Sequence, residues 1–461
     1  MRKQLRIDLE DTIAAISTAQ GEGAIGIVRI SGKEAVKIAD LVFKSKKGKS
    51  PSGFRSFATH YGYVYNKAVV VDEALLTLMR SPKSYTKEDM VEINCHGGII
   101  TLRNTLELVL DSGARLAEPG EFTKRAFLNG RLDLAQAEAV LDIVRSKTEA
   151  SLRMALGQLS GRLSSRLNDI KERLLAALAS IEASIDFPEE DIEIISESDT
   201  KGRLKIVKDN LAKLLESAQG GIILREGLTS VICGKPNVGK SSLLNALLQR
   251  DRAIVTHVPG TTRDAIEDLA NINGIPFKLV DTAGIAPTED LVEREGILKS
   301  RERIEQADLI LMVLDASAEM TDEDRILLSD TKGKPRILVI NKADLPRKID
   351  LRTLEGNVLV SVSAKEADGI DALKKAMERA VWSGRAAAPE SGSITNLRQE
   401  QALKNASDAV DRAGEAVEKG FSPELIAIEL REALDSIGEI TGEIVTDDIL
   451  ERVFSQFCIG K

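Results

Sequence analysis

The stretch that most constrains the fold is GKPNVGKSS, which runs from Gly234 to Ser242. It follows the apolar run TSVIC, which is typical of a buried strand, and it leads into KSSLLNALLQ, whose apolar residues recur with helical spacing. A GxxxxGKS sequence between a strand and a helix is the context that a phosphate-binding P-loop requires. We therefore expect a strand, a glycine-rich loop and a helix whose N-terminus faces phosphate groups.

Residues of this loop have distinct expected roles. The backbone around Gly239 wraps phosphate with its N–H groups, Lys240 reaches the β- and γ-phosphates, and the Ser241 hydroxyl ligates Mg²⁺. Asp281 follows the apolar run FKLV, where it can hold the Mg²⁺ shell. The nucleotide-binding candidates of these two stretches are Asn237, Val238, Gly239, Lys240, Ser241, Ser242, Asp281, Thr282, Ala283 and Gly284.

Two further strand ends carry a base-recognition pattern, VINKAD and VSAK. The candidates are Asn341, Lys342, Ala343, Asp344, Ser363, Ala364 and Lys365. A carboxylate at Asp344 accepts two hydrogen bonds from guanine N1 and N2, whereas adenine offers no such pair of donors. Because an unpaired carboxylate in a binding site is costly, the pattern favours GTP over ATP. In order and spacing these motifs resemble those of the translation-factor class of GTPases.

The segment HVPGTTRD, from His257 to Asp264, is expected to be an order–disorder switch, and Thr256 directly precedes it. Thr262 would complete the Mg²⁺ shell only when γ-phosphate is bound. Ile285 follows DTAG, where Ras-like enzymes carry a water-positioning Gln, so another residue must position water. Glu293 is a candidate for that catalytic role, although taken alone it is one solvated acid among many. The nucleotide-binding candidates of the switch are Thr256, His257, Val258, Pro259, Gly260, Thr261 and Thr262.

Asn237 indicates how charge is neutralised during hydrolysis. In GTPases that this region resembles, an Asn here and backbone carbonyls of the switch loop hold a K⁺ ion where an arginine finger would otherwise sit. The resemblance implies K⁺ ligands at Asn237, Thr256, Val258 and Thr261. An arginine finger is worth about 10³ to 10⁵ in rate, so a cation in its place could supply a comparable share. The alternative is that Asn237 is a simple turn residue.

The chain divides into regions of different periodicity. Residues 1–128 mix β-like runs such as GAIGIVRIS with short helices, which predicts an α+β domain. Residues 129–222 have helical periodicity, and residues 223–382 alternate strand and helix, which predicts a mostly parallel, doubly wound sheet. Helical periodicity resumes over residues 383–461. We therefore expect a discontinuous helical domain with a Ras-like P-loop domain inserted between its two parts.

Composition limits the function classes. The 461 residues have a formal net charge of −9, which argues against a broad cationic surface for nucleic acid. The three cysteines, Cys95, Cys233 and Cys458, lie far from one another without metal-ligand spacing, and the three histidines are equally scattered, so we expect neither a disulfide framework nor a zinc site. There is no signal-peptide pattern and no run of about 18 apolar residues, so we expect a cytoplasmic protein without a membrane partner.

One motif matches a dinucleotide-binding fingerprint but lacks the structural context that the fingerprint requires. GEGAIG, from Gly21 to Gly26, matches the GxGxxG fingerprint of dinucleotide-binding proteins. The following residues, AIGIVRIS, alternate like a strand and do not open a helix. Because that fingerprint requires a helix behind the glycines, we reject a dinucleotide site.

The same region resembles the MnmE (TrmE) family of tRNA modification GTPases. The likeness rests on DTIAAISTAQGEGAIGIVRISG, SYTKEDMVEINCHGG, EPGEFTKRAFLNGRLDLAQAEAVLDIV, ASIDFPEEDI, the GTPase motifs and the terminal FCIGK, and it covers nearly the whole chain. It implies a folate-binding N-terminal domain that also forms a homodimer. It also implies K⁺-stimulated GTP hydrolysis through dimerisation of the inserted P-loop GTPase domain (the G domain). The implied product is a carboxymethylaminomethyl-type group on C5 of the tRNA wobble uridine, formed together with a flavin-dependent, MnmG-type partner. The two proteins would form a heterotetramer in which the partner holds most of the tRNA.

The resemblance also implies a folate site. A tetrahydrofolate derivative, in the 5-formyl or 5,10-methylene form, would be bound by Arg29, Glu92, Arg131 and Lys461 and would supply the one-carbon unit. An anionic folate tail requires cations, and a carboxylate such as Glu92 accepts hydrogen bonds from the amino-pteridine. Arg131 stands where relatives carry Lys, and Lys87 stands where Gly is common. Taken one at a time, Arg29 and Glu92 could equally be ordinary surface charges.

The terminal FCIGK, residues 457–461, has two interpretations. It is either a frayed end anchored by Phe454 and Phe457, or a segment that brings Cys458 and Lys461 to the folate site. The resemblance favours the second. A thiol beside Lys461 is biased towards thiolate, which makes Cys458 a candidate catalytic nucleophile toward uridine or folate. A packing or positioning role for Cys458 is the alternative.

Three functions are compatible with these residues. The first is a GTP-hydrolysing enzyme of tRNA wobble-uridine modification, and the second is a ribosome-assembly GTPase in which nucleotide gates RNA affinity. The third, a folate-dependent one-carbon enzyme with an attached switch, merges with the first. The ribosome-assembly alternative needs a basic RNA-binding surface, which the acidic composition disfavours. We predict the first function; the sequence does not indicate how GTP turnover is coupled to modification, which tRNAs are modified or which residues contact uridine.

Overall fold

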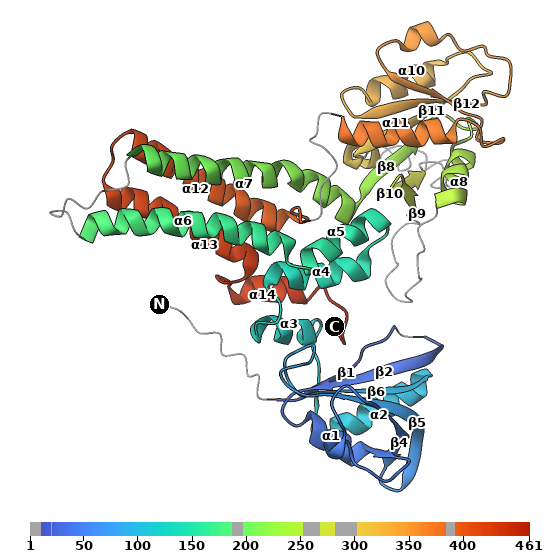
Figure 1. Ribbon diagram of the computed structural model, residues 1–461. Coiled ribbons are helices and arrows are strands. Elements are labelled where there is room, and N and C mark those ends of the chain that lie inside the picture. The colour runs from blue at the N-terminus through green and yellow to red at the C-terminus, as the bar shows by residue number, and fades with distance from the viewer. Residues whose placement is uncertain (1–10, 20, 187–196, 252–267, 282–301, 384–391) are drawn as a thin grey trace. The chain divides into compact units, whose positions relative to one another are not determined.

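The computed structural model describes residues 11–19, 21–186, 197–251, 268–281, 302–383 and 392–461 (Figure 1). The chain separates into two compact units. The first unit joins residues 1–141 to residues 438–461, and the second unit is residues 142–437. Each unit contains one β-sheet of its own.

The first unit is built on a seven-stranded sheet in the order β3-β4-β5-β6-β2-β1-β7. Neighbouring strands are antiparallel, except that β7 runs parallel to β1. The strands are β1 (Ile13–Ile16), β2 (Gly23–Ser31), β3 (Phe43–Ser45), β4 (Thr59–Asn66), β5 (Val69–Met79), β6 (Met90–Gly97) and β7 (Arg115–Leu116). The prediction that GAIGIVRIS forms a strand is confirmed, and with it the rejection of the dinucleotide site, because β2 is a strand between two antiparallel neighbours.

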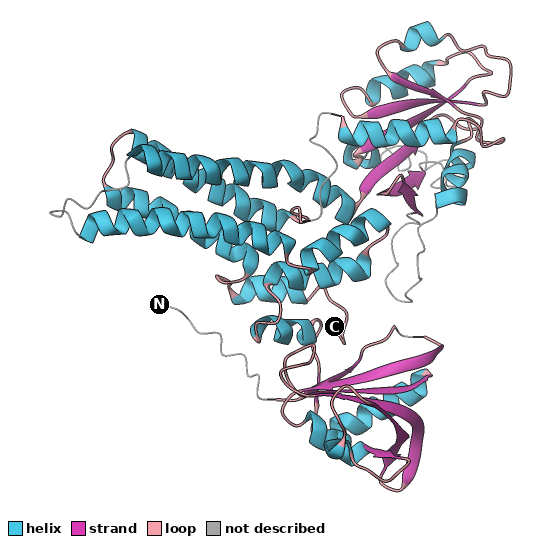
Figure 2. Ribbon diagram, viewed as in Figure 1, coloured by secondary structure: helices cyan, strands magenta, loops and turns pink. Residues whose placement is uncertain are grey.

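Helices cover one face of this sheet (Figure 2). Alternation along β5 buries Ala74, Leu76 and Leu78 in a core shared with the helices α1 (Ala35–Val42) and α2 (Ile99–Asp111). A short 3₁₀ turn, η1 (Pro51–Gly53), follows β3. The unit also contains the helices α3 (Glu121–Leu128) and α14 (Asp447–Phe454), whereas α4 (Leu134–Arg145) and α13 (Pro423–Thr441) cross the boundary between the units.

Long amphipathic helices form part of the second unit. They are α5 (Glu149–Leu159), α6 (Arg162–Asp186), α7 (Glu197–Glu226) and α12 (Leu397–Glu418). The stripe Leu163, Leu167, Ile170 and Leu174 of α6 is buried, as its spacing predicts. Helix α7 packs against α6 and α12, so helices that precede and follow the α/β segment pack together (Figure 1). The predicted discontinuous helical domain is confirmed.

The second unit also contains a six-stranded sheet in the order β13-β12-β11-β8-β10-β9. Its strands are β8 (Leu228–Cys233), β9 (Asp268–Ile272), β10 (Ile275–Asp281), β11 (Leu309–Asp315), β12 (Arg336–Asn341) and β13 (Val358–Ser361). All pairs are parallel except β9 with β10. Alternate residues of β11 enter two different cores, Leu311 in one and Met312 in the other, so both faces of the sheet are covered. The predicted doubly wound, mostly parallel sheet is confirmed.

Helices α8 (Lys240–Asp251) and α10 (Asp322–Asp330) and the 3₁₀ turn η3 (Leu351–Leu354) lie between strands of this sheet, and α11 (Ile370–Trp382) follows β13. Because β8, β10, β11, β12 and β13 are parallel, their carboxyl ends lie along one edge of the sheet, where open α/β sheets bind ligands. In the part of the chain that the structure describes, no helix has both the length and the apolar character needed to cross a membrane.

Candidate functional site

The loop between β8 and α8 has the backbone conformation that its glycines allow. Gly234 and Gly239 have φ angles of 149° and 96°, and Asn237 has a φ of 62° in the left-handed region. A Cβ on Gly239 would lie 2.3 Å from Asn341 Nδ2, and one on Gly234 would lie 2.5 Å from the carbonyl oxygen of Val313. Neither position has room for a side chain, so the loop requires both glycines.

Lys240 is turned into this loop. Its Nζ donates to the main-chain oxygens of Gly234 at 2.8 Å and Lys235 at 2.9 Å. Lys240 is buried, and burial lowers the pKa of its ammonium group. The ammonium group therefore lies inside the loop. In the described part of the chain, its hydrogen bonds go to main-chain carbonyl oxygens.

Two hard oxygen donors meet at the start of α8. The Ser241 hydroxyl donates to Asp281 Oδ2 at 2.9 Å, and Asp281 is the last residue of β10. Hydroxyl and carboxylate oxygens are the ligand types that Mg²⁺ prefers, and Mg²⁺ usually takes its other ligands from phosphates and water. Among the described residues, no group of three or more His, Cys, Asp or Glu side chains is placed to hold a metal ion.

Asn341 connects the loop after β12 to the phosphate loop. Its Nδ2 donates to the main-chain oxygen of Val238 at 2.8 Å, and its Oδ1 accepts from the main-chain N–H of Ala364 at 3.0 Å. Lys342 follows with a φ of 63°, and its Nζ donates to Asp315 Oδ2 at 2.6 Å. The residue pattern NKAD and the segment after β13 are thus joined by hydrogen bonds.

Asp344 lies at the rim of the same region. Its Oδ1 accepts a hydrogen bond from the Ser363 hydroxyl at 2.7 Å. That hydrogen bond, a hydrogen bond from the backbone N–H of Asp344 and, after them, the charges of Lys365 and Lys342 hold the pKa of Asp344 below its usual range. The carboxylate is therefore ionised at neutral pH and can accept hydrogen bonds from a ligand.

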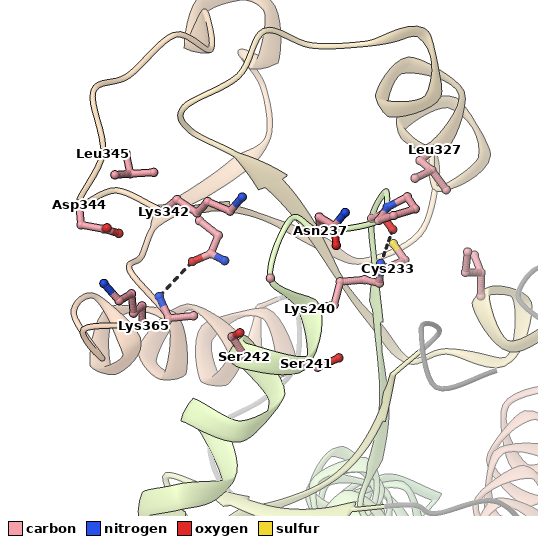
Figure 3. A pocket seen from close by; sticks show the side chains of 16 residues that line it. Cys233, Asn237, Lys240, Ser241, Ser242, Leu327, Lys342, Asp344, Leu345 and Lys365 are labelled. Atoms are coloured by element: carbon pink, nitrogen blue, oxygen red, sulfur yellow. Dashed lines mark hydrogen bonds between the residues drawn. The ribbon is translucent and has the colours of Figure 1, made fainter. Parts of the chain in front are cut away.

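One cavity of about 1000 Å³ brings these residues together (Figure 3). Asp344 and Lys365 lie at one end of it, and Asn237 and Lys240 lie at the other. Its lining residues come from the P-loop, the two base-recognition segments and neighbouring helices: Cys233, Gly234, Pro236, Asn237, Gly239, Lys240, Ser241, Ser242, Ile304, Leu327, Asn341, Lys342, Asp344, Leu345, Ala364 and Lys365. The cavity has a cationic and glycine-rich end and an end with an acidic acceptor.

Residues predicted for a second site meet in the first unit. Arg29 and Glu92 are paired across β2 and β6, and Arg29 Nη2 lies 2.8 Å from Glu92 Oε1. The guanidinium carbon of Arg29 lies 5.7 Å from the centre of the Tyr85 ring, and that of Arg131 lies 4.6 Å from the same centre. Lys87 has a φ of 59°, the left-handed conformation that favours Gly. Tyr85 thus lies close to both arginines.

The terminal FCIGK segment is held by this unit. Ile459 bridges to Pro119, the N–H of Phe122 donates to the main-chain oxygen of Lys461 at 3.2 Å, and Arg29 Nη1 donates to that of Gly460 at 3.3 Å. Phe457 is buried, whereas the Cys458 side chain is exposed. The tail lies against the Arg29 and Glu92 pair, so the frayed-end interpretation is wrong.

Several predicted residues lie outside the described part of the chain. They are the switch residues Thr256, His257, Val258, Pro259, Gly260, Thr261 and Thr262, the DTAG residues Thr282, Ala283 and Gly284, and Glu293. Their roles stay predictions.

Two contacts were missed by the sequence reasoning. Asp315 is the last residue of β11 and binds Lys342, and the rule that ligand-site residues follow parallel strands could have identified it. Tyr85 lies in an irregular loop, and no local sequence pattern indicates that its ring lies close to two arginines.

A doubly wound sheet with a P-loop after β8 and NKAD at the end of β12 defines a P-loop nucleotide-binding protein of the GTPase class. A family model described as the MnmE helical domain matches residues 134–458, and one described as the GTP-binding protein TrmE N-terminus matches residues 12–131. The chain belongs to the MnmE (TrmE) family.

Whole-length relatives agree with this assignment. The tRNA modification GTPase MnmE of Thermoanaerobacter pseudethanolicus is 49% identical, with 98% of this chain and 99% of that protein covered. The protein of the same name in Clostridioides difficile is 47% identical, with 98% of this chain and 100% of that protein covered. Among solved structures, Aquifex aeolicus Era bound to GDP and AlF₄⁻ is 28% identical with a TM-score of 0.27, covering 40% of this chain and 66% of that one.

Proposed function

We propose that the protein is a GTP-hydrolysing enzyme that acts in tRNA modification, at the wobble uridine. The observation that carries the proposal is the single cavity with the P-loop lysine Lys240 at one end and Asp344 at the other. It occurs in a chain whose whole-length relatives are named tRNA modification GTPases. No basic RNA-binding face is needed for this function if a partner holds most of the tRNA.

The chain's residues have separate tasks in nucleotide binding. Backbone N–H groups of the P-loop surround phosphate oxygens, and the Lys240 ammonium exchanges the carbonyls of Gly234 and Lys235 for phosphate oxygens. Ser241, with Thr262 in the triphosphate state, would supply hydroxyl ligands for Mg²⁺, and a bound Mg²⁺ would supply positive charge beside the transferred phosphoryl group. Asp344 accepts hydrogen bonds from guanine N1 and N2, while Asn341 and Lys342 hold that end of the cavity together.

Hydrolysis is proposed to depend on K⁺. Asn237 lines the cavity, and its φ of 62° lies in the left-handed region. With Thr256, Val258 and Thr261 it would hold a cation beside the phosphates, in place of an arginine finger. Glu293 would orient the attacking water. Dimerisation of two G domains would complete this arrangement.

Folate chemistry is proposed for the first unit. Arg29, Glu92, Arg131 and Lys461 would bind a tetrahydrofolate derivative, which supplies the one-carbon unit. The contacts of Arg29 with Glu92 and with Gly460 support a common site for these residues. Cys458 is a candidate nucleophile there. The protein would act as a homodimer with an MnmG-type, flavin-dependent partner in a heterotetramer, in the cytoplasm.

The test measures GTP turnover of the purified protein in K⁺ and Na⁺ buffers of equal ionic strength. Strong stimulation by K⁺ alone is expected. Asn237→Gly should remove the difference between the salts, because Gly keeps the left-handed backbone but has no amide oxygen. Equal slow rates of the wild-type protein in both salts would contradict the K⁺ mechanism.

A second experiment tests tRNA modification in a bacterial host whose own MnmE-family gene has been deleted. Mass spectrometry of its digested tRNA should show the wobble-uridine modification restored by the wild-type gene. Lys240→Ala should fail to restore it, because GTP binding loses its phosphate lysine. Unmodified tRNA in cells that contain folded wild-type protein would refute the proposed function.

A further inference from the structure

The second residue of the P-loop, Lys235, takes part in a nearly buried ion pair. Its Nζ lies 2.9 Å from Asp324 Oδ2, and the two side chains are only 16% and 3% exposed. Asp324 belongs to the first turn of α10, which follows a different strand of the sheet. The pair therefore joins the P-loop to a helix 89 residues further along the chain.

Asp324 is itself fixed by its own helix. Its Oδ2 accepts from the main-chain N–H of Thr321 at 3.0 Å, as in a capping box, and also from the Thr321 hydroxyl at 2.9 Å. Burial raises the pKa of Asp324, but the bonds from Thr321 and Lys235 outweigh burial and lower it overall. The other carboxylate oxygen, Oδ1, is buried with no partner in the described part of the chain. Lys235 is thus the cation that compensates this carboxylate.

The pair acts on main chain that touches the P-loop lysine. The carbonyl of Lys235 accepts a hydrogen bond from Lys240 Nζ, and the next residue, Pro236, has no N–H and restricts the backbone of Lys235. Anchoring the Lys235 side chain therefore limits the direction of that carbonyl. Leu327, one turn beyond Asp324, lines the cavity on the same side as Asn237 and Lys240 (Figure 3).

We propose that Lys235 and Asp324 are positioning residues for nucleotide binding. Their ion pair holds the P-loop in the conformation that receives phosphate and keeps the wall formed by α10 against it. The inference rests on the proposed GTPase function of the same cavity. A purely structural pair would affect folding stability, whereas a positioning pair affects GTP affinity even when stability is restored.

The experiment compares Lys235→Met, Asp324→Asn and the double variant in the full-length chain. Met keeps the apolar stem of the lysine, and Asn keeps an oxygen for the two Thr321 bonds. Dissociation constants are measured with a fluorescent N-methylanthraniloyl GTP analogue, and thermal midpoints are measured without nucleotide. Each single variant leaves a buried charge uncompensated, so its midpoint should fall, whereas the double variant has no such charge and should recover.

The dissociation constant separates the two explanations. We expect the dissociation constant to rise about tenfold in both single variants and to stay raised in the double variant. A tenfold change corresponds to the loss of about one charge-assisted hydrogen bond. Lys235→Arg, which keeps the charge, should bind GTP nearly as tightly as the wild-type protein. The matched control is Glu323→Gln, the exposed neighbour on the same helix turn, and it should change neither quantity.

Recovery of wild-type affinity in the double variant would overturn the inference, as would unchanged affinity in the single variants. A wild-type protein that did not bind the GTP analogue would overturn the proposed function and this inference with it. If the wild-type protein bound the GTP analogue and the variants bound it with unaltered affinity, the inference would be overturned and the proposed function would stand.

Discussion

The side-chain amide of Asn341 lies 2.8 Å from the main-chain oxygen of Val238, so the base-recognition segment is bonded directly to the phosphate loop. The same side chain accepts from the N–H of Ala364 at 3.0 Å. Asn341 is buried. Three loops of the nucleotide cavity therefore share one side chain, and their relative positions depend on it.

Replacing Asn341 by Ala should destabilise the protein and weaken GTP binding together. The change leaves the buried carbonyl of Val238 and the partly buried N–H of Ala364 without this partner, at a cost of about 2 to 4 kcal/mol in the free energy of unfolding. Urea unfolding followed by circular dichroism measures this loss. Asn405→Ala, at an exposed position of α12, serves as the control. Unchanged stability of the Asn341 variant would remove the structural role assigned to it.

Replacing Asp344 by Asn should change base preference from guanine to xanthine. The amide oxygen still accepts from N1–H, but its NH₂ group meets the guanine amino group, whereas xanthine offers a carbonyl at that position. Losing charge-assisted hydrogen bonds should weaken GTP binding about 100-fold. The change is measured by the concentrations of GTP and of XTP that displace the fluorescent analogue from the protein. Equal GTP affinity in variant and wild type would exclude Asp344 from base recognition.

The features predicted correctly from sequence are local ones. The strands β2, β8 and β12 come from continuous β-branched or apolar runs, and the P-loop motif occupies nine consecutive residues, Gly234 to Ser242. The sequence also places Asn341 and Asp344 after a strand, where a parallel sheet gathers ligand-binding residues. What the sequence did not indicate is that Asn341 bonds to Val238, because that contact joins residues 103 positions apart.

The folate candidates show the limit of local patterns most clearly. Arg29 and Glu92 become neighbours through the register of β2 with β6, and the carbonyl of Gly460 reaches Arg29 across 431 residues of chain. No periodicity encodes such a contact, so only the family resemblance suggested it. Tyr85 was overlooked for the same reason: its surroundings come from tertiary packing.

The three cysteines should differ in reactivity at pH 8. Burial raises the pKa of Cys95 to about 11 and that of Cys233 to about 12, so each is almost wholly protonated at this pH. Cys458 is exposed. Iodoacetamide should therefore label Cys458 and spare the other two, as measured by peptide mass spectrometry. All three should be labelled in urea, which is the control for reagent access.

The sign of the pH dependence can be checked with the same reagent. A raised thiol pKa means that thiolate forms only as the pH approaches that value, so labelling of Cys95 in the native protein should increase between pH 8 and pH 10. Cys233 should follow at higher pH than Cys95. Rapid labelling of Cys95 at pH 8 would contradict its burial in the core of the first unit.

Replacing Gly460 by Ala should release the terminal FCIGK segment. Gly460 has a φ of 95°, and a Cβ there would lie 2.2 Å from the carbonyl oxygen of Ile16 and 2.9 Å from Ser17 Cα. Both are main-chain atoms at the end of β1 and cannot move aside as a side chain would. The tail must therefore shift, and Arg29 should lose its bond to the Gly460 carbonyl.

The expected result is lost tRNA modification with unchanged GTP affinity, because the nucleotide cavity belongs to the other unit. Modification is measured by mass spectrometry of tRNA from the complemented host, and affinity with the fluorescent GTP analogue. Gly53→Ala is the control, since a Cβ at Gly53 meets no atom within 4 Å. If the Gly460 variant modified tRNA normally while limited proteolysis showed a released tail, the tail would have no part in the reaction. The docked position of FCIGK would then be explained by the burial of Phe457 alone.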